Sequence, residues 1–321
     1  MIQTPQPILG FFREKLDIEE FHFKSPQYEQ AYHELIDLLE AKGVYVAILM
    51  GNGAYDGTGG FSKHWVRVRS SYGYVFEKRG FIQPHVVWVK DRFDGSGIAQ
   101  INDPEFRRIC SDKNETYRLL YEFQPRSVLV EHTDDAEGVV SELPGEMVAV
   151  KALQGNSGKQ VFVGKKTDFD IAQFNQPLPW QIQEYIETDG GIPGVVEGRH
   201  DFRVVVIDGQ PAIATLRTPP VGSYKSNLGY GGEAKIIDAS MVPSELVEIC
   251  RLIDQRLASI GENRFYSADF GLTQYGWRLF ELNAMPGTIS RDRGEPAVEY
   301  QEKVATFMAQ AASKNAQKGA I

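Results

Sequence analysis

Apolar residues recur along this chain at two different spacings, and each spacing predicts a type of secondary structure. Over residues 27–42 they fall three and four positions apart, which is the period of one helix face, and Gly43 ends the pattern. Residues 44–50 (VYVAILM) are an apolar run bounded by glycines, and residues 84–90 (PHVVWVK) are a second short run, so we expect two strands there. This order of elements predicts a small α/β domain over residues 1–110.

The next part of the chain predicts one helix and a group of short strands. The helix covers residues 110–123, where Ser111 or Asp112 is a suitable N-terminal cap. The strands are expected over residues 127–130, 147–151, 160–164 and 182–186. A glycine-rich tip joins the second strand to the third, which predicts a β-hairpin. We therefore expect an α+β domain over residues 111–187.

The remainder of the chain predicts a second α+β domain, over residues 188–321. It contains two further hairpins, one around an Asp-Gly turn at 208–209 and one around a turn at 273–276. Their strands are expected over residues 201–207, 211–217, 265–272 and 277–282. Helical periodicity over residues 243–260 and 295–313 adds two helices. The chain is therefore expected to combine α/β and α+β parts.

Composition indicates a globular protein and narrows its partners. Of 321 residues, 42% are hydrophobic and 24% are charged, which is ordinary for a soluble protein with a core. The formal net charge of −9 argues against a nucleic-acid binder that depends on a basic face. Two distant cysteines, Cys110 and Cys250, make no disulfide framework. The N-terminus does not resemble a signal peptide and no apolar segment is long enough to cross a bilayer, so we predict a cytoplasmic protein without membrane partners.

Three oxygen-bearing side chains converge on the last predicted hairpin. Glu281 and Asn283 are two positions apart on one strand, so they share a face of the sheet. With the turn at 273–276, Asp269 on the preceding strand falls opposite Glu281. Hard oxygen ligands on a rigid element suit magnesium, which also takes oxygens from substrate phosphates. The alternative is a solvated polar face whose acids have no joint role.

A glycine-rich tip follows the strand that ends at Lys151. The tip consists of Gly155, Asn156, Ser157 and Gly158, with Lys159 directly after it. Such a tip can direct backbone N–H groups at phosphate oxygens. It is not a Walker loop, because Leu153 and Gln160 stand where that motif needs Gly and Ser or Thr. A plain hairpin with a flexible tip is the alternative interpretation.

Several cations occur close to these segments in the sequence. They are Lys113 at a predicted helix start, Arg203 after Asp201, Arg217 at a strand end, and Lys225 in a loop with Asn227. Phosphoryl transfer needs cations that are aimed at the charge developing on the phosphoryl oxygens. Taken singly, each of these side chains is also readable as a solvated surface charge.

In chain order these segments resemble the ATP-grasp superfamily, and in particular its ribosomal-protein glutamate ligase branch. The motifs lie within roughly residues 104–310 and are Asp112-Lys113, Lys151 with GNSGK, Gln183-Glu184-Tyr185-Ile186, Asp201-Phe202-Arg203, Arg217, Lys225-Ser226-Asn227-Leu228 with Gly231-Gly232, Asp269, and Glu281-Leu282-Asn283 with Pro286-Gly287. Each motif alone is weak, whereas their joint order is specific. The resemblance implies an ATP-grasp fold, with an N-terminal α/β (pre-ATP-grasp) domain and an ATP cleft between two α+β subdomains.

The resemblance also implies which residues bind ATP. Lys113 and Lys151 would hold the α- and β-phosphates, and the loop 155–159 would close over the triphosphate. The adenine contacts would be Glu184, Tyr185 and Ile186, the ribose would meet either Glu187 or Asp189, and Asn227 would be a further nucleotide contact. The ribose ligand stays open, because residues 188–200 are longer than the same segment in the glutamate-ligase branch.

Metal and substrate residues follow from the same resemblance. The implied magnesium ligands are Asp269, Glu281 and Asn283, for two ions, with Mn²⁺ an acceptable replacement. Arg217, with Arg203 beside it, would stabilise the transferred phosphoryl group. The candidates for gripping a substrate carboxylate are Lys225, Arg291 and Arg293, against the equal alternative of surface charges.

The activity implied by the resemblance is an ATP-dependent ligase. Such an enzyme activates a carboxylate as an acyl phosphate and condenses it with an amine, releasing ADP and phosphate. The substrates would be small molecules or peptides, and homo-oligomers are common in the family. Two alternatives are a kinase that phosphorylates a small-molecule hydroxyl and a catalytically inactive nucleotide-binding protein. The complete Asp/Glu/Asn trio and both lysines argue against an inactive protein.

Overall fold

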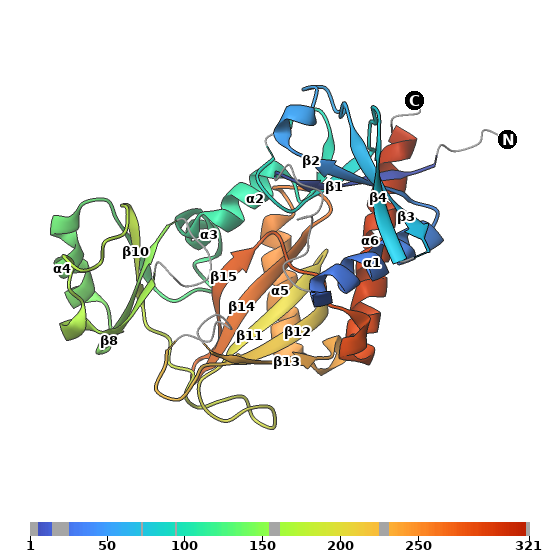
Figure 1. The fold of residues 1–321 in the computed structure, drawn as a ribbon. Helices are drawn as coiled ribbons and strands as arrows, with labels where there is room; N and C mark the ends of the chain where they lie inside the picture. Colours follow the sequence, from blue (N-terminus) through green and yellow to red (C-terminus); the bar gives the residue numbers. More distant parts are fainter. Residues whose placement is uncertain are drawn as a thin grey trace. The chain divides into compact units, whose positions relative to one another are not determined.

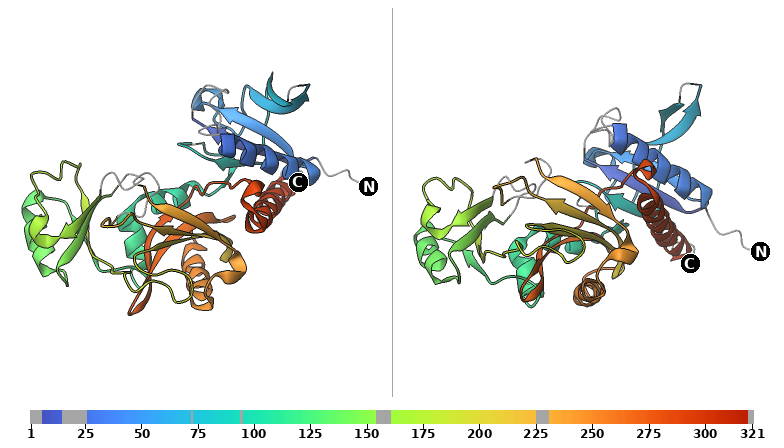
Figure 2. Two further views of the ribbon diagram at one scale, coloured as in Figure 1. Left: turned by 60° about the horizontal axis from the view of Figure 1, so that its bottom comes forward. Right: turned by 90° about the horizontal axis from the view of Figure 1, so that it is seen from below.

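The computed structural model describes residues 6–14, 26–71, 73–93, 95–153, 161–224 and 231–318. The chain forms two compact units, drawn in Figures 1 and 2. The first comprises Met1–Pro104, Ile260–Phe265 and Met285–Ile321, and the second comprises Glu105–Ser259 and Tyr266–Ala284. The division into three domains at residues 110 and 187 stays a prediction.

The first unit is a six-stranded sheet with two helices, α1 (Pro26–Ala41) and α6 (Glu295–Lys318), packed against it and against each other. The strands lie in the order β4-β3-β2-β1-β5-β6. They are β1 (Ile8–Arg13), β2 (Tyr45–Met50), β3 (His64–Ser70), β4 (Gly73–Arg79), β5 (Val86–Val89) and β6 (Ala99–Ile101). β1, β2, β5 and β6 run parallel, whereas β3 and β4 form an antiparallel hairpin at one edge. The α/β character predicted for the N-terminal part is confirmed.

Aromatic side chains form the core of the first unit. Phe11 on β1 packs edge-on against Trp88 on β5, with 5.0 Å between ring centroids, and against Tyr32 on α1, at 6.4 Å. All three are almost fully buried. Alternation along β1 turns Phe12 to the other face, where it packs against Phe61 and Phe93. The apolar runs of β1 and β5 are therefore buried on both faces, as expected for parallel strands.

The second unit contains a four-stranded antiparallel sheet in the order β7-β10-β8-β9. Its strands are β7 (Ser127–Val130), β8 (Met147–Ala152), β9 (Val161–Lys165) and β10 (Trp180–Glu184). One face packs against α4 (Thr133–Glu142) through Val148, Val150, Trp180 and Ile182. Side chains alternate along a strand, so the opposite face carries the residues between these four. That face bears the polar side chains of the candidate site.

The second unit also contains a five-stranded sheet in the order β13-β12-β11-β14-β15. Its strands are β11 (Asp201–Ile207), β12 (Gln210–Thr218), β13 (Glu233–Ile237), β14 (Phe265–Thr273) and β15 (Gly276–Asn283). Helix α5 (Ser244–Leu257) packs against β12 and buries Leu246, Cys250, Ile253 and Leu257. Four short 3₁₀ helices complete the described elements: Asn52–Ala54, Lys166–Asp168, Ala239–Met241 and Arg291–Arg293.

One predicted helix is corrected by the structure, because residues 110–123 do not form a single helix. α2 (Pro104–Ser111) ends before Asp112, and α3 (Lys113–Leu120) begins directly after it. The backbone of Asp112 is extended, and its Oδ1 accepts hydrogen bonds from the backbone N–H groups two and three residues further on, at 2.9 and 3.0 Å. Asp112 is therefore the cap, and it separates the two helices.

The other predicted helices and strands are present, with ends shifted by a few residues. The elements that the sequence pattern did not predict are β1, β3, β4, β6, β13, α2 and α4. Among the described residues, no helix combines the length and apolar character needed to cross a membrane.

Candidate active site

The hairpin of β14 and β15 carries the predicted metal ligands in the predicted register. Asp269 pairs with Glu281, and Ser267 pairs with Asn283. A β-bulge follows Asp269, and the extra residue on β15 is Phe280. Bulges re-aim side chains, and here Phe280, Glu281 and Asn283 all line one pocket. The bulge thus adds an aromatic ring to the acidic side of the hairpin.

Gly271 on β14 makes room for this ring. A Cβ atom on Gly271 would lie 2.4 Å from Cζ of Phe280 and 2.6 Å from Cγ2 of Thr188. Both distances are far shorter than the roughly 3.5–4.0 Å of a normal carbon contact. The position of the Phe280 ring therefore requires glycine at residue 271.

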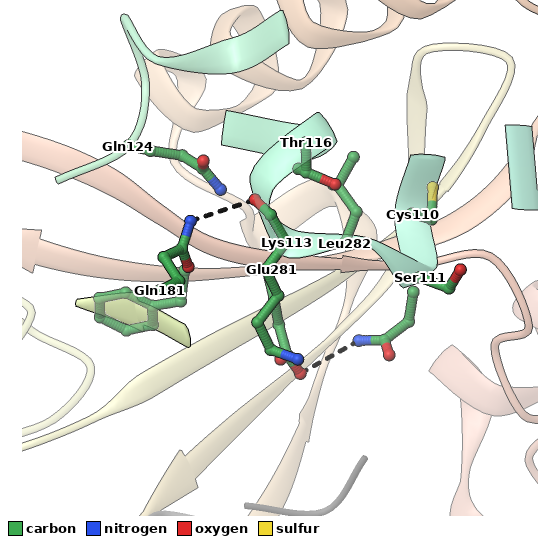
Figure 3. A pocket seen from close by; sticks show the side chains of 10 residues that line it. Cys110, Ser111, Lys113, Thr116, Gln124, Gln181, Glu281 and Leu282 are labelled. Atoms are coloured by element: carbon green, nitrogen blue, oxygen red, sulfur yellow. Dashed lines mark hydrogen bonds between the residues drawn. The ribbon is translucent and has the colours of Figure 1, made fainter. Parts of the chain in front are cut away.

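The pocket beside the hairpin draws its lining from α2, α3, β10 and β15 (Figure 3). The lining residues are Cys110, Ser111, Lys113, Thr116, Gln124, Gln181, Phe280, Glu281, Leu282 and Asn283. Nε2 of Gln181 donates to the carbonyl oxygen of Lys113 at 3.1 Å, a bond that Figure 3 marks with a dashed line. Nδ2 of Asn283 lies 3.4 Å from Oε1 of Glu281. Polar side chains from segments far apart in the sequence thus face one space.

Asp269 is a buried carboxylate held by two arginines. Nε and Nη2 of Arg203 donate to its two oxygens at 2.6 and 2.7 Å, and Nη2 of Arg217 donates to Oδ2 at 2.7 Å. Burial alone would raise the pKa of Asp269, but the two guanidinium groups outweigh it and lower the pKa to about 2. The carboxylate is therefore ionised at neutral pH, as a metal ligand must be.

Arg217 also donates to a second carboxylate, Oδ2 of Asp201, which lies directly opposite it on β11. Burial and the nearby charge of Asp269 raise the pKa of Asp201 to about 7, against the opposing effect of Arg217. The other oxygen of Asp201, Oδ1, is buried and has no hydrogen-bond partner among the residues that the structure describes. Buried polar atoms are normally paired, so this oxygen is available for a hydrogen bond with a ligand.

Two lysines reach the same cluster from α3 and β8. Nζ of Lys113 donates to the carbonyl oxygen of Leu153 at 3.2 Å, and Nζ of Lys151 donates to Oε1 of Gln183 at 2.6 Å. Burial lowers the pKa of both ammonium groups, that of Lys151 to about 8, while the charge of Glu281 opposes the shift in both. Both cations therefore lie within electrostatic reach of one carboxylate.

The donor set on the hairpin fits magnesium. An ionised carboxylate offers about four lone-pair directions, and Asp269 accepts three N–H bonds, which leaves it capacity for one more ligand. The Glu281 side chain is 43% exposed, with Nη2 of Arg203 at 3.9 Å, so its oxygens are accessible. In the part of the chain that the structure describes, no three His, Cys, Asp or Glu side chains are placed to hold a metal ion together. The set on the hairpin instead combines two carboxylates with one amide.

The residues expected to contact adenine and ribose line a second, more open pocket beside the β14–β15 turn. These residues are Glu184, Tyr185, Ile186, Glu187 and Asp189. The side chain of Asp189 is engaged by Arg199, whose Nε and Nη2 donate to its two oxygens at 2.5 and 3.0 Å. Glu187 is exposed. By contrast, Asp201 lies beside Arg217 and Asp269, and its Oδ1 has no hydrogen-bond partner among the described residues.

The remaining predicted residues lie elsewhere. Those outside the described residues are Gly155, Asn156, Ser157, Gly158, Lys159, Lys225 and Asn227. Arg291 and Arg293 belong to the first unit, in the 3₁₀ helix before α6. The backbone N–H of Arg291 donates to Oε2 of Glu34 at 2.8 Å, and Nη2 of Arg293 donates to Oε1 of Gln27 at 3.1 Å.

Four residues of the cluster had no assigned role in the sequence analysis. They are Asp201, Gln181, Gln183 and Phe280. Asp201 and Gln183 belong to motifs on which the family resemblance rests, so the sequence marked both positions although it assigned no role to either residue. Phe280 had no signal, because its orientation depends on the bulge.

Comparison with known proteins shows the family to which the chain belongs. Residues 116–289, more than half of the chain, match the family model described as the prokaryotic glutathione synthetase ATP-grasp domain. The chain is 26% identical to a probable alpha-L-glutamate ligase of Psychromonas ingrahamii, over 62% of this chain and 63% of that protein. It is 24% identical to a glutathione synthetase of Vibrio parahaemolyticus, over 65% of this chain and 62% of that one. The match thus spans less than two thirds of the length of these relatives.

A solved structure supports the fold. The ATP-grasp ligase PsnB, complexed with a minimal precursor, Mg and ADP, superposes with a TM-score of 0.59. The match covers 97% of this chain and 99% of that one at 13% identity. The predicted ATP-grasp fold and the resemblance to glutamate ligases are confirmed. The chain therefore belongs to the family whose model is described as the prokaryotic glutathione synthetase ATP-grasp domain.

Proposed function

We propose that this protein is an ATP- and Mg²⁺-dependent ligase that condenses a carboxylate with an amine and releases ADP and phosphate. One observation carries the proposal: two lysines and two arginines are grouped around the oxygen donors of a single hairpin. They are Lys113, Lys151, Arg203 and Arg217, and the donors are Asp269, Glu281 and Asn283. Cations beside oxygen ligands are what a metal–polyphosphate complex requires. The glutamate ligase and glutathione synthetase names of the relatives support the same chemistry.

ATP would lie with its phosphates at Lys113 and Lys151 and its adenine at the hinge segment 184–186. For the ribose we favour Asp201 over Glu187 and Asp189. Oδ1 of Asp201 is buried and unpartnered, so a ribose hydroxyl would satisfy it. The loop 155–159 would close over the triphosphate and, with Asn227, complete the nucleotide site.

Asp269, Glu281 and Asn283 would hold magnesium, for which we propose two ions and Mn²⁺ as an acceptable replacement. When bound, the metal would neutralise charge on the phosphate oxygens. Arg217 and Arg203 would stabilise the phosphoryl group in transfer. The described part of the chain gives the buried Nε atom of Arg217 no partner, which supports a ligand contact beyond the two carboxylates.

The proposed reaction has two steps. A substrate carboxylate oxygen attacks the γ-phosphorus, the bond to the β-phosphate oxygen breaks, and ADP leaves with that electron pair. The amine nitrogen then attacks the acyl carbon, the bond to the phosphate oxygen breaks, and the amine loses a proton. The protein contributes positioning and charge, and excludes water from the acyl phosphate.

The substrates are proposed as a class, small-molecule or peptide carboxylates and amines. Lys225, Arg291 and Arg293 stay candidates for a substrate carboxylate. The cytoplasmic location and a homo-oligomeric state likewise stay predictions.

Release of ADP across a panel of amino acids and dipeptides, with the mass of each product, tests the proposal. We expect a product equal to the two substrates less one water. A product heavier by one phosphoryl group and stable to hydroxylamine would instead identify a kinase. Absence of ADP release across the panel, with no nucleotide bound, would refute the proposal.

A further inference from the structure

Strand β10 presents two glutamines to the face of its sheet that carries the lysine of β8. Trp180 and Ile182 point into the core beneath α4, so Gln181 and Gln183 point the other way. In register, Gln181 lies opposite Lys151. Both glutamines are 3% exposed. A buried amide needs partners, and both have specific ones.

Gln183 belongs to a directed chain of hydrogen bonds. Nζ of Lys151 donates to its Oε1 at 2.6 Å, and its Nε2 donates to Oγ of Ser127 at 2.9 Å. The hydroxyl of Ser127 donates in turn to the carbonyl oxygen of Pro125 at 3.0 Å. An ammonium group can only donate, which fixes the orientation of the amide. The chain of hydrogen bonds thus links the ammonium of Lys151 to the backbone just before β7.

Gln181 forms a contact of a different kind. Its Nε2 donates to the backbone carbonyl oxygen of Lys113, the first residue of α3, at 3.1 Å. It therefore ties the start of α3 to the sheet through a backbone carbonyl rather than through an ammonium group. Two alternate residues of one strand thus contact the two lysines of the candidate phosphate site.

We propose that Gln183, supported by Ser127, is a positioning residue that holds the ammonium of Lys151 for nucleotide phosphates, and that Gln181 holds Lys113 through its backbone. This proposal rests on the proposed function. A lysine side chain has many rotamers, so fixing it before the ligand arrives reduces the entropy lost on binding. The acceptor is a neutral amide, which leaves the full positive charge available to the phosphates. A carboxylate at residue 183 would neutralise that charge.

The surroundings of Lys151 make such an acceptor necessary. Burial disfavours its charged form, and so does the nearby charge of Lys113. The carboxylates of Glu281, Asp201 and Asp269 oppose these effects from the other sheet. Gln183 supplies the one hydrogen bond that the described residues give to Nζ. It therefore favours a charged, oriented Lys151 without pairing its charge.

Two variants of matched length test the proposal, Gln183→Met and Gln183→Glu. The dissociation constant for ADP would be measured by calorimetry with EDTA present, between pH 7.5 and 9.5. We expect both variants to bind ADP about tenfold more weakly than the wild type at pH 7.5. ADP affinity should decline at alkaline pH, where Lys151 loses its proton. This alkaline decline should begin at lower pH in Gln183→Met, because the charged amine has lost its hydrogen-bond acceptor. It should move to higher pH in Gln183→Glu, because a carboxylate favours the ammonium form.

Further variants separate positioning from general weakening. Ser127→Ala should weaken ADP binding, and Ser127→Thr, which keeps the hydroxyl, should restore it. Gln181→Met should weaken binding without moving the alkaline decline, since the hydrogen bond that it removes ends on a backbone carbonyl oxygen. Ile182→Val, on the same strand but facing the core, should lower thermal stability and leave ADP binding unchanged.

Unchanged ADP affinity and an unmoved alkaline decline in both Gln183 variants would overturn the inference. Failure of the proposed function is recognised separately, by a folded wild type that binds no ADP. In that event, NMR titration of isotope-labelled lysine tests the contact between Lys151 and Gln183 in the absence of nucleotide. The Lys151 amine should titrate at lower pH in Gln183→Met and at higher pH in Gln183→Glu, and identical titration in both would reject the contact.

Discussion

Asp269 on β14 lies directly opposite Glu281 on β15, and the two carboxylates have opposite surroundings. The Asp269 side chain is 3% exposed and held by two arginines, whereas that of Glu281 is 43% exposed. One ligand of the proposed metal site is therefore fixed and the other is free to adjust. Magnesium demands near-ideal octahedral geometry, which an adjustable ligand helps to satisfy. Glu281 is also the more exposed of the two ligands, although its charge favours the ammonium forms of the buried Lys113 and Lys151.

We therefore expect Glu281→Ala to lower Mg²⁺-dependent ADP release by about 10²–10³-fold, as for removal of a catalytic electrostatic group. Its free energy of unfolding should fall by only about 1 kcal/mol, because the half-exposed carboxylate is screened by solvent although it favours the charged forms of two buried lysines. Turnover as a function of Mg²⁺ concentration measures the first effect and urea unfolding the second. Glu137→Ala on α4, another exposed carboxylate, should alter neither. Wild-type turnover in Glu281→Ala would refute the metal assignment.

The ribose contact can be assigned by comparing two aspartates. If Oδ1 of Asp201 accepts from a ribose hydroxyl, the wild type should bind ATP about tenfold more tightly than 2′,3′-dideoxy-ATP. Asp201→Asn should bring that ratio close to one. Asp189→Asn should preserve it, because the oxygens of Asp189 are engaged by Arg199. If the ratio instead falls to about one in Asp189→Asn, the ribose contact is Asp189 and not Asp201.

The pH dependence of nucleotide binding should report Lys151. Burial lowers its pKa to about 8 in the free protein, and phosphates raise it in the complex, so binding above pH 8 takes up a proton. ADP affinity should therefore fall as pH rises beyond about 8, by up to about tenfold per unit. Lys151→Arg stays charged throughout this range, so its affinity should be flat between pH 7.5 and 9.5. Parallel declines in both proteins would assign the titration to another group.

The Asp269–Glu281 pairing was predictable because it depends only on a tight turn and the two-residue period of a strand. The pairing of Asp201 with Arg217 was not. Counting from the turn at 208–209 would place Leu216 opposite Asp201, but a register shift between Val205 and Val206 brings Arg217 there instead. A slip of one residue turns a side chain to the other face of the sheet. No pattern in the sequence marks this bulge.

The unpredicted elements have local physical reasons. β3 and β4 form the edge hairpin, in which β4 has no fully buried residue, so the hydrophobic alternation is weak. α4 starts after His132, whose side chain makes no capping hydrogen bond, so the usual N-terminal signal is missing. Contacts such as that of Gln183 with Lys151 join residues 32 positions apart. They follow from strand order, which local periodicity does not specify.

Arg217 should contribute strongly to stability as well as to chemistry. Its guanidinium is the cation shared by Asp201 and Asp269, and its side chain is 8% exposed. Arg217→Met leaves two buried carboxylates close together, so we expect the free energy of unfolding to fall by about 3–5 kcal/mol. Adding Asp201→Asn should recover part of the loss. Arg251→Ala removes an exposed pair with Glu248 and should cost no more than about 1 kcal/mol. Equal losses in the two single variants would contradict the buried network.

The same substitution at two glycines should have opposite effects. At Gly271 a methyl group would meet Cζ of Phe280 at 2.4 Å, so Gly271→Ala should destabilise the protein by about 1–3 kcal/mol and weaken ADP binding by displacing the ring. At Gly138, inside α4, a Cβ would meet nothing within 4 Å, so Gly138→Ala should stabilise by about 0.5–1 kcal/mol.

Urea unfolding and ADP calorimetry of both alanine variants measure these effects. Phe280→Leu, which lacks the Cζ atom, should relieve the clash when combined with Gly271→Ala and recover part of the lost stability. If Gly271→Ala is as stable as the wild type and binds ADP equally well, the ring does not occupy this place beside β14, and Phe280 has no part in the nucleotide site.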